Sequence, residues 1–168
     1  MRVLLRLVIP TTILMGGCGP VPQNAAELRT AIDKGSGKKD VSEVDRPLAT
    51  VSNSFEEMGP KCFNKRVEST STRSGPYGGS SHTMVWDYRV KVTRLASKTE
   101  MSLQQEFVGG VISPNTAPEG GFYVLVADAE PAGNKTRITI YGSSAQDTLF
   151  DAIKAWAEGG TDCPDLSE

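Results

Sequence analysis

TMVWDYRVKVTRL, residues 83–95, is the stretch of the sequence that decides the fold. From position 84 to position 92 every second residue is apolar or aromatic, and most residues between them are polar or charged. Because side chains of a strand point alternately to its two faces, this pattern predicts a half-buried antiparallel strand. The expected inward residues are Met84, Trp86, Tyr88, Val90 and Val92, and the expected outward residues are Asp87, Arg89, Lys91 and Thr93.

The next alternating stretch, Thr99–Val108, follows a short turn at Ala96–Lys98, so the two stretches predict a β-hairpin. Charge indicates its register, because like charges directly opposite each other destabilise a strand pair. One register sets Arg89 opposite Glu106, whereas the register two residues away sets Asp87 opposite Glu106. We expect the first, which pairs Val92 with Leu103.

Two more strands are predicted after the hairpin. Phe122–Ala127 is apolar on both faces, which is typical of a strand inside the sheet or covered on each side. Thr136–Tyr141 alternates again, with Ile138 and Ile140 inward. Before the hairpin, Phe63–Ser69 is a candidate fifth strand. The segments 69–81 and 109–121 are rich in Gly, Ser, Thr or Pro and are predicted to be loops.

Helical periodicity appears at both ends of this series. Asp45 is a candidate N-cap, Pro47 suits a first turn, and Gly59-Pro60 is expected to end the helix. The apolar residues of that helix are Leu48, Val51, Phe55 and Met58. In the last helix Ser144 and Asp147 have the spacing of a capping box, and Gly159 is a suitable stop. Its apolar stripe consists of Leu149, Phe150, Ile153, Trp156 and Ala157.

These elements predict an α+β fold, in which a four-stranded antiparallel meander, or a five-stranded one with Phe63–Ser69, carries both helices on one face. The order of elements resembles that of helix-grip domains, including those in lipoprotein subunits of the outer-membrane barrel-assembly machinery. That resemblance covers element order alone, and no sequence motif accompanies it.

The first eighteen residues have the zones of a secretory signal peptide: a cationic start with Arg2 and Arg6, an apolar run, and small residues before Cys18. The apolar run is shorter than the ~20 residues that a membrane-spanning helix needs. Met15-Gly16-Gly17-Cys18 resembles the lipobox of bacterial lipoprotein signal peptides, although leucine is usual where Met15 stands.

The lipobox resemblance implies that Cys18 becomes the lipidated first residue of the mature protein. Gly19, where aspartate would favour retention at the inner membrane, implies the outer membrane of a Gram-negative bacterium, with the domain facing the periplasm. Once Cys18 is modified, Cys62 and Cys163 remain as an even pair in an oxidising compartment, so we predict that they form a disulfide.

The chain is accordingly divided into a signal peptide (1–17), a lipid-anchored tether (18–44) and one α+β domain (45–168). The tether is polar and contains the linker-like stretch Lys34–Lys39. Within it, Asn24 is a candidate cap for a short helix with Leu28, Ala31 and Ile32 on one face. Removing the signal leaves 151 residues, the size of one ordinary domain.

No motif in the sequence indicates catalysis. His82, the only histidine, lies beside two serines and five residues before Asp87, but no nucleophile-elbow motif is present. Two distant cysteines and one histidine do not make a metal site, and no basic stripe indicates nucleic acid. We therefore expect no cofactor and no enzymatic activity, and predict an envelope lipoprotein that acts through protein contacts. The alternatives are a binding module for a small apolar ligand or cell-wall fragment, and, less favoured, a hydrolase.

Overall fold

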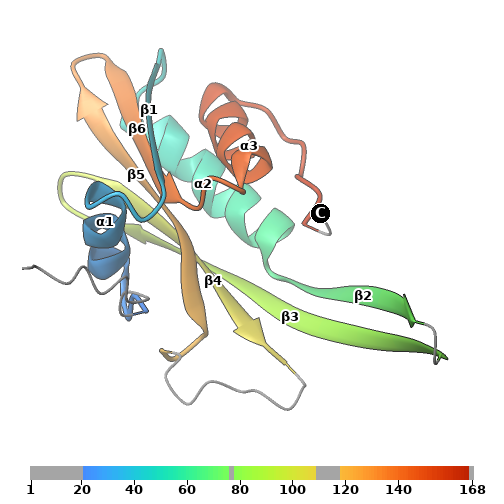
Figure 1. Ribbon diagram of the computed structural model, residues 1–168. Coiled ribbons are helices and arrows are strands. Elements are labelled where there is room, and N and C mark those ends of the chain that lie inside the picture. The colour runs from blue at the N-terminus through green and yellow to red at the C-terminus, as the bar shows by residue number, and fades with distance from the viewer. Residues whose placement is uncertain (1–20, 76–77, 109–117, 167–168) are drawn as a thin grey trace, which may run out of the picture.

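The computed structural model describes residues 21–75, 78–108 and 118–166. Three helices and six strands lie within these residues (Figure 1). The helices are α1 (Ala25–Asp33), α2 (Leu48–Phe63) and α3 (Asp147–Glu158). The strands are β1 (Lys38–Val44), β2 (Lys65–Gly75), β3 (Gly78–Arg94), β4 (Thr99–Phe107), β5 (Phe122–Ala132) and β6 (Lys135–Gly142).

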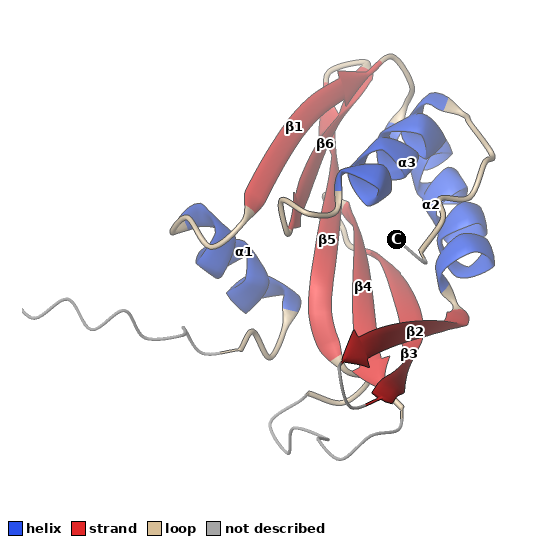
Figure 2. Cartoon of the chain, turned by 45° about the vertical axis from the view of Figure 1, so that its right-hand side comes forward, coloured by secondary structure: helices blue, strands red, loops and turns tan. Residues whose placement is uncertain are grey.

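The six strands form one antiparallel sheet in the order β1-β6-β5-β4-β3-β2. α2 and α3 cover one face of this sheet, as predicted, while α1 lies on the other (Figure 2). The α+β class is therefore confirmed, but the strand count is six and not four or five. The candidate strand at Phe63–Ser69 is confirmed from Lys65 onward and extends to Gly75 as β2, whereas Phe63 belongs to α2, and β1 was not predicted.

The segment 69–81 is not a loop, because most of it belongs to the hairpin of β2 and β3. Its composition suggests a loop, but threonine is also favoured in strands. Thr70 lies opposite Thr83, and their hydroxyl oxygens are 3.0 Å apart. Figure 1 shows this hairpin extending well beyond the ends of the helices.

β1 lies in the polar stretch that predicts a tether, and it pairs along its whole length with β6. Its alternation is concealed because the inward positions include Asp40 and Ser42 as well as the buried Val44. Asp40 is bound by Lys154 of α3 at 3.2 Å, so the carboxylate is accommodated on the inward side. A strand at the rim of the sheet needs less apolar surface than an interior strand.

The register predicted for the hairpin of β3 and β4 is wrong. Val92 pairs with Met101, and Asp87 lies directly opposite Glu106. Each carboxylate has a cation beside it. Arg66 of the neighbouring strand β2 donates two hydrogen bonds to Asp87, at 2.8 and 2.9 Å. Arg89 binds Glu106 diagonally at 2.8 Å. Like charges opposite each other are tolerated here because each has a cation beside it.

The main core lies between the sheet and the pair α2 and α3. The predicted apolar stripe of α3 is confirmed, since all five of its residues are buried. Trp156 packs at 5.0 Å from the ring of Phe63, and its indole N–H donates to the carbonyl of Asp162 at 2.8 Å. The predicted disulfide between Cys62 and Cys163 is confirmed, with its Cα atoms 5.2 Å apart. It fastens the end of the chain to the end of α2.

Three helix-end predictions need correction. α2 begins after Pro47 with no side-chain cap, so Asp45 does not cap it, and Ser144 likewise makes no capping hydrogen bond to α3. α2 also continues through Pro60 to Phe63. Proline lacks an N–H and usually breaks a helix interior. Here the extra turn buries Cys62 and Phe63, which outweighs the lost hydrogen bond. At α3, Gly159 ends the helix as predicted, with φ of 105°.

α1 forms a second, smaller core on the opposite face. The predicted cap is confirmed, because the side-chain oxygen of Asn24 accepts from the N–H of Glu27 at 2.9 Å. Leu28 and Ile32 pack on Val126 and Tyr141 of the sheet. β5 is therefore covered on both faces, as its continuous apolar sequence predicts.

Candidate functional site

The sheet face that carries the main core continues beyond the helices onto the β2–β3 hairpin and the end of β4. We call Met84, Trp86 and Phe107 the uncovered sheet face, while Val67 beside Trp86 still packs against the main core. Register places Val67 and Phe107 on either side of Trp86. The rings of Trp86 and Phe107 are 4.8 Å apart, and both residues are half-buried, while Met84 is 39% exposed. Trp156 is a core residue as predicted, but Trp86 is only partly covered.

Tyr88 and Gln105 mark the point where the core gives way to this uncovered sheet face. Gln105 Nε2 donates to the Tyr88 hydroxyl at 2.8 Å. Burial raises the pKa of the Tyr88 phenol, and the hydrogen bond from Gln105 opposes that rise. This hydrogen bond satisfies the Tyr88 hydroxyl at the rim of the main core.

On the opposite face, a part-buried charge cluster joins α1 to the sheet. Arg29 of α1 donates to both carboxylate oxygens of Asp128, at 2.8 and 2.7 Å, and also binds Glu100. Lys98 binds Asp128 at 2.9 Å. Burial alone would lower the pKa of Arg29, but the hydrogen bonds to Asp128 and Glu100 outweigh it and raise that pKa. The cluster is balanced and holds α1 in place.

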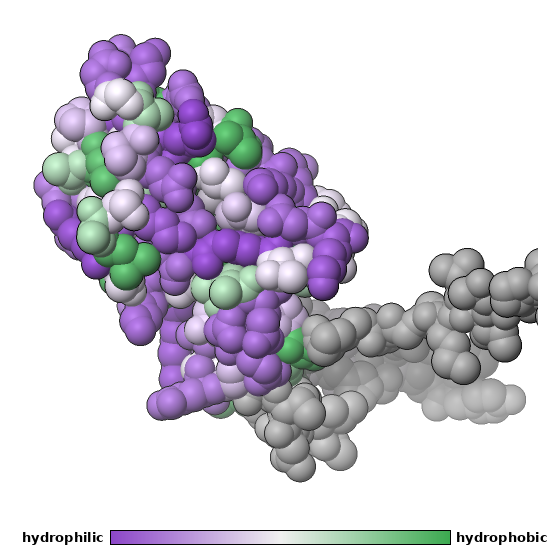
Figure 3. Space-filling model, turned by 90° about the vertical axis from the view of Figure 1, so that its left-hand side faces the viewer, coloured by the Kyte–Doolittle hydropathy of each residue, from purple (hydrophilic) through white to green (hydrophobic). Residues whose placement is uncertain are grey.

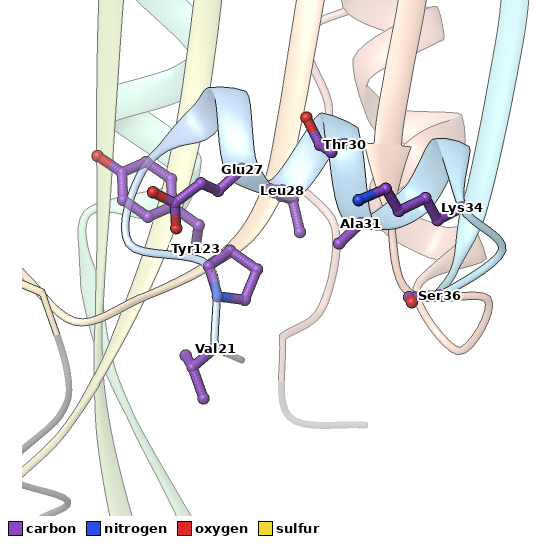
Figure 4. Close-up of a pocket in the computed structure, with 9 residues that line it drawn as sticks. Val21, Glu27, Leu28, Thr30, Ala31, Lys34, Ser36 and Tyr123 are labelled. Carbon is purple, nitrogen blue, oxygen red and sulfur yellow. The ribbon is translucent and has the colours of Figure 1, made fainter. Parts of the chain in front are cut away.

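A groove lies beside α1, with a volume of about 610 Å³. Leu28 and Ala31 point from the helix toward the side where Val21 lies, and Tyr123 of β5 lies at one end (Figure 4). Pro22 also lines the groove. The remaining lining residues are polar or charged: Glu27, Thr30, Lys34 and Ser36. The groove offers apolar contact with a few polar groups at its edge. On the side of the molecule that faces left in Figure 1, the described surface is mostly hydrophilic with small hydrophobic patches (Figure 3).

The residues considered for hydrolysis all lie in β3. His82 lies in β3 opposite Ser71 and not in a loop. Positions 82 and 87 belong to opposite faces of that strand, since they are an odd number of residues apart. Asp87 is already bound by Arg66, whose hydrogen bonds hold the Asp87 pKa below its ordinary value.

Cys18, the predicted lipidation site, lies outside the described residues. Within the described ranges, no three His, Cys, Asp or Glu residues are grouped as metal ligands would be. No helix in that part of the chain is long and apolar enough to cross a membrane. The charge cluster and the groove were not predicted. Nothing in the local sequence around Arg29 indicates that Glu100 and Asp128 would meet it.

Comparison with protein-family models finds no match to this sequence, and comparison with curated proteins finds none either.

Proposed function

We propose that this protein is a non-enzymatic lipoprotein of the cell envelope that acts through protein–protein contacts in the periplasm, in envelope assembly or as a scaffold. Lipid on Cys18 anchors it to the outer membrane of a Gram-negative bacterium. The zones of residues 1–18 and their resemblance to a lipobox support the anchor. The proposal includes no cofactor and no nucleic acid.

The observation that carries this proposal is the uncovered sheet face. Tryptophan and other aromatic residues are enriched where proteins bind each other, especially in partly apolar patches on a rigid support. Trp86 and Phe107 form such a pair, and Met84 adds an adaptable apolar side chain beside them. The strands that carry these residues continue directly from the packed core.

Site-specific photo-crosslinking in intact cells tests this assignment. A photoreactive amino acid at Met84 should give discrete cross-linked products, whereas one at Val41 should give few. Val41 is a matched control because it is also an apolar strand residue, is 54% exposed, and lies on the opposite edge strand. Equal cross-linking at the two positions would contradict a role for the uncovered sheet face.

The anchor has a separate test that uses metabolic labelling with a fatty-acid analogue. Cys18→Ser should abolish labelling and leave an unprocessed or soluble chain, because the serine hydroxyl cannot accept the thioether-linked lipid. Ser42→Ala serves as a control that leaves Cys18 in place. Labelling that persists in Cys18→Ser would overturn the lipoprotein assignment, although the disulfide-closed fold would stand.

The groove beside α1 favours a second candidate, binding of a small apolar ligand. Its volume of about 610 Å³ and its apolar lining by Leu28, Ala31 and Tyr123 suit a ligand of drug-like size. Ala31→Trp should fill the groove and weaken binding of an apolar fluorescent probe such as anilinonaphthalene sulfonate. Binding that is unchanged by this substitution would place the probe elsewhere and remove the support for this function.

A further inference from the structure

β2 is an edge strand of eleven residues, and its outer rim is open. Glu68, Ser69, Thr70, Ser71 and Thr72 are all exposed. The other edge strand, β1, carries charged residues at four of its seven positions, which is a common protection against edge-to-edge pairing. In contrast, positions 69–72 of β2 carry no charge, and the strand contains no proline.

Hydrogen-bond parity shows which backbone groups of β2 point outward. The N–H of Val108 donates to the carbonyl of Val85, so the backbone N–H and C=O groups of odd-numbered residues in β3 point toward β4. The N–H of Val90 donates to Asn64 Oδ1 just before β2, so the backbone N–H and C=O groups of even-numbered residues in β3 point toward β2. Trp86 therefore exchanges hydrogen bonds with Val67, its partner in register.

The alternate residues of β2 remain for another strand. The backbone N–H and C=O groups of Arg66, Glu68, Thr70 and Thr72 are directed at the free edge. From this we infer that β2 is a self-association surface: two copies of the chain pair antiparallel through β2, with a two-fold axis at Thr70, and their sheets become one continuous sheet.

The length and charge of β2 select this register. Thr70 is the central residue of Lys65–Gly75 and is directed outward, so a two-fold axis there pairs all eleven residues with the correct parity. It sets Glu68 opposite Thr72 of the second copy. An axis at Glu68 would oppose two carboxylates, and an axis at Ser69 would shorten the pairing and set two cationic positions opposite each other.

The resulting contact is isologous, so it closes at two copies and leaves no further β2 edge exposed. The axis is perpendicular to the sheet, which places the uncovered sheet faces of both copies on the same side. The inference depends on the fold alone, so it holds whether or not Cys18 carries a lipid, and the test below is run on detergent-solubilised protein, where no outcome depends on membrane attachment.

Cysteine cross-linking of the detergent-solubilised chain, under mild oxidation, tests the register. Thr70→Cys should give a covalent product of twice the mass of a single chain, because opposite residues in such a pair have Cα atoms about 5.5 Å apart, within disulfide range. Glu68→Cys alone and Thr72→Cys alone should not, since each would lie about 13 Å from its own copy along the strand. A mixture of these two variants should cross-link. Equal cross-linking of all three single variants, or none, would overturn the inference.

Thr70→Pro and Thr70→Ala provide a matched pair for the assembly itself. Proline removes the outward N–H, which pairs with no other strand among the described residues, so the hairpin should survive while the dimer is lost. Alanine keeps the N–H and should leave the dimer intact. Sedimentation velocity of the detergent-solubilised full chain measures the mass, and circular dichroism checks that both variants fold. A wild-type chain that stays monomeric, or a proline variant that stays dimeric, would refute the proposal.

Discussion

Docking of α1 should depend on Arg29. Arg29→Met preserves a long side chain but removes the bidentate hydrogen bonds to Asp128 and the contact with Glu100. The side chain of Asp128 is only 6% exposed and would keep Lys98 as its single cation. Glu100 would lose its cation. α1 has nine residues, too few for a stable isolated helix, so its docking depends on these contacts and on Leu28 and Ile32.

The magnitude follows from the burial of the pair. Hydrogen bonds to charged groups contribute about 1.5–3 kcal/mol each, and breaking a fully buried ion pair costs about 3–5 kcal/mol. Arg29 retains 18% side-chain exposure and Lys98 remains in place, so the cost of breaking this pair should not exceed the lower end of the range for a fully buried pair. We expect Arg29→Met to lower the free energy of local α1 opening by about 2–3 kcal/mol. The packing of Leu28 and Ile32 should remain.

Native-state hydrogen exchange at the α1 amides measures this local opening. A loss of about 2–3 kcal/mol accelerates exchange by about 30- to 150-fold. Arg89→Met is a suitable control, because its pair with Glu106 is about half exposed and includes no residue of α1. A double-mutant cycle with Asp128→Asn should give a coupling of about 1.5 kcal/mol or more. Unprotected α1 amides in the wild type, or a coupling below about 0.5 kcal/mol, would refute docking through this cluster.

Three further predictions concern the rest of the fold. Alanine at both cysteines of the disulfide should lower the free energy of unfolding by about 3–5 kcal/mol in urea titration, because the bond spans 101 residues; a loss below about 1 kcal/mol would contradict this. Ser52→Ala should cost about 1–2 kcal/mol, because Thr99, which lies 2.6 Å from the Ser52 hydroxyl, is buried and loses its partner, whereas Ser54→Ala should cost less. Arg66→Gln should raise the Asp87 pKa toward its ordinary value in a carboxyl NMR titration. The stability that Arg66 provides through Asp87 is present above the unfolded pKa and lost as pH falls through the lowered folded pKa, so an unchanged Asp87 pKa would argue against the ion pair.

Elements with a continuous apolar stripe can be predicted from the sequence because one periodicity specifies both structure and burial. The stripe of α3 ending at Trp156 and the alternation from Met84 to Val92 are examples. The disulfide is equally accessible, because a count of cysteines suffices once Cys18 is set aside. Predictions of this kind need no information about which segments meet.

Predictions fail where a third segment decides. The register at Glu106 was argued from two strands, but Arg66 on β2 and the diagonal Arg89 neutralise the opposed carboxylates. The sequence of β1 is similar to that of a linker because an inward position carries the charged Asp40. The cation that compensates this charge, Lys154, is distant in sequence. The carboxyl end of α2 shows the same dependence, since the helix continues beyond Pro60 to bury Phe63 in the core.

The docking of α1 changes what the proposed anchor implies. A tether of residues 18–44 could reach about 90 Å from the membrane, at about 3.5 Å per residue. With α1 packed on the sheet from Ala25, only the residues between Cys18 and Asn24 are available, and their reach is about 20 Å. α1 lies on the opposite side of the sheet body from the projecting β2–β3 hairpin (Figure 1). A lipid on Cys18 would therefore hold the α1 side near the bilayer and direct the uncovered sheet face and the β2 edge away from it, where a protein partner or a second copy can approach.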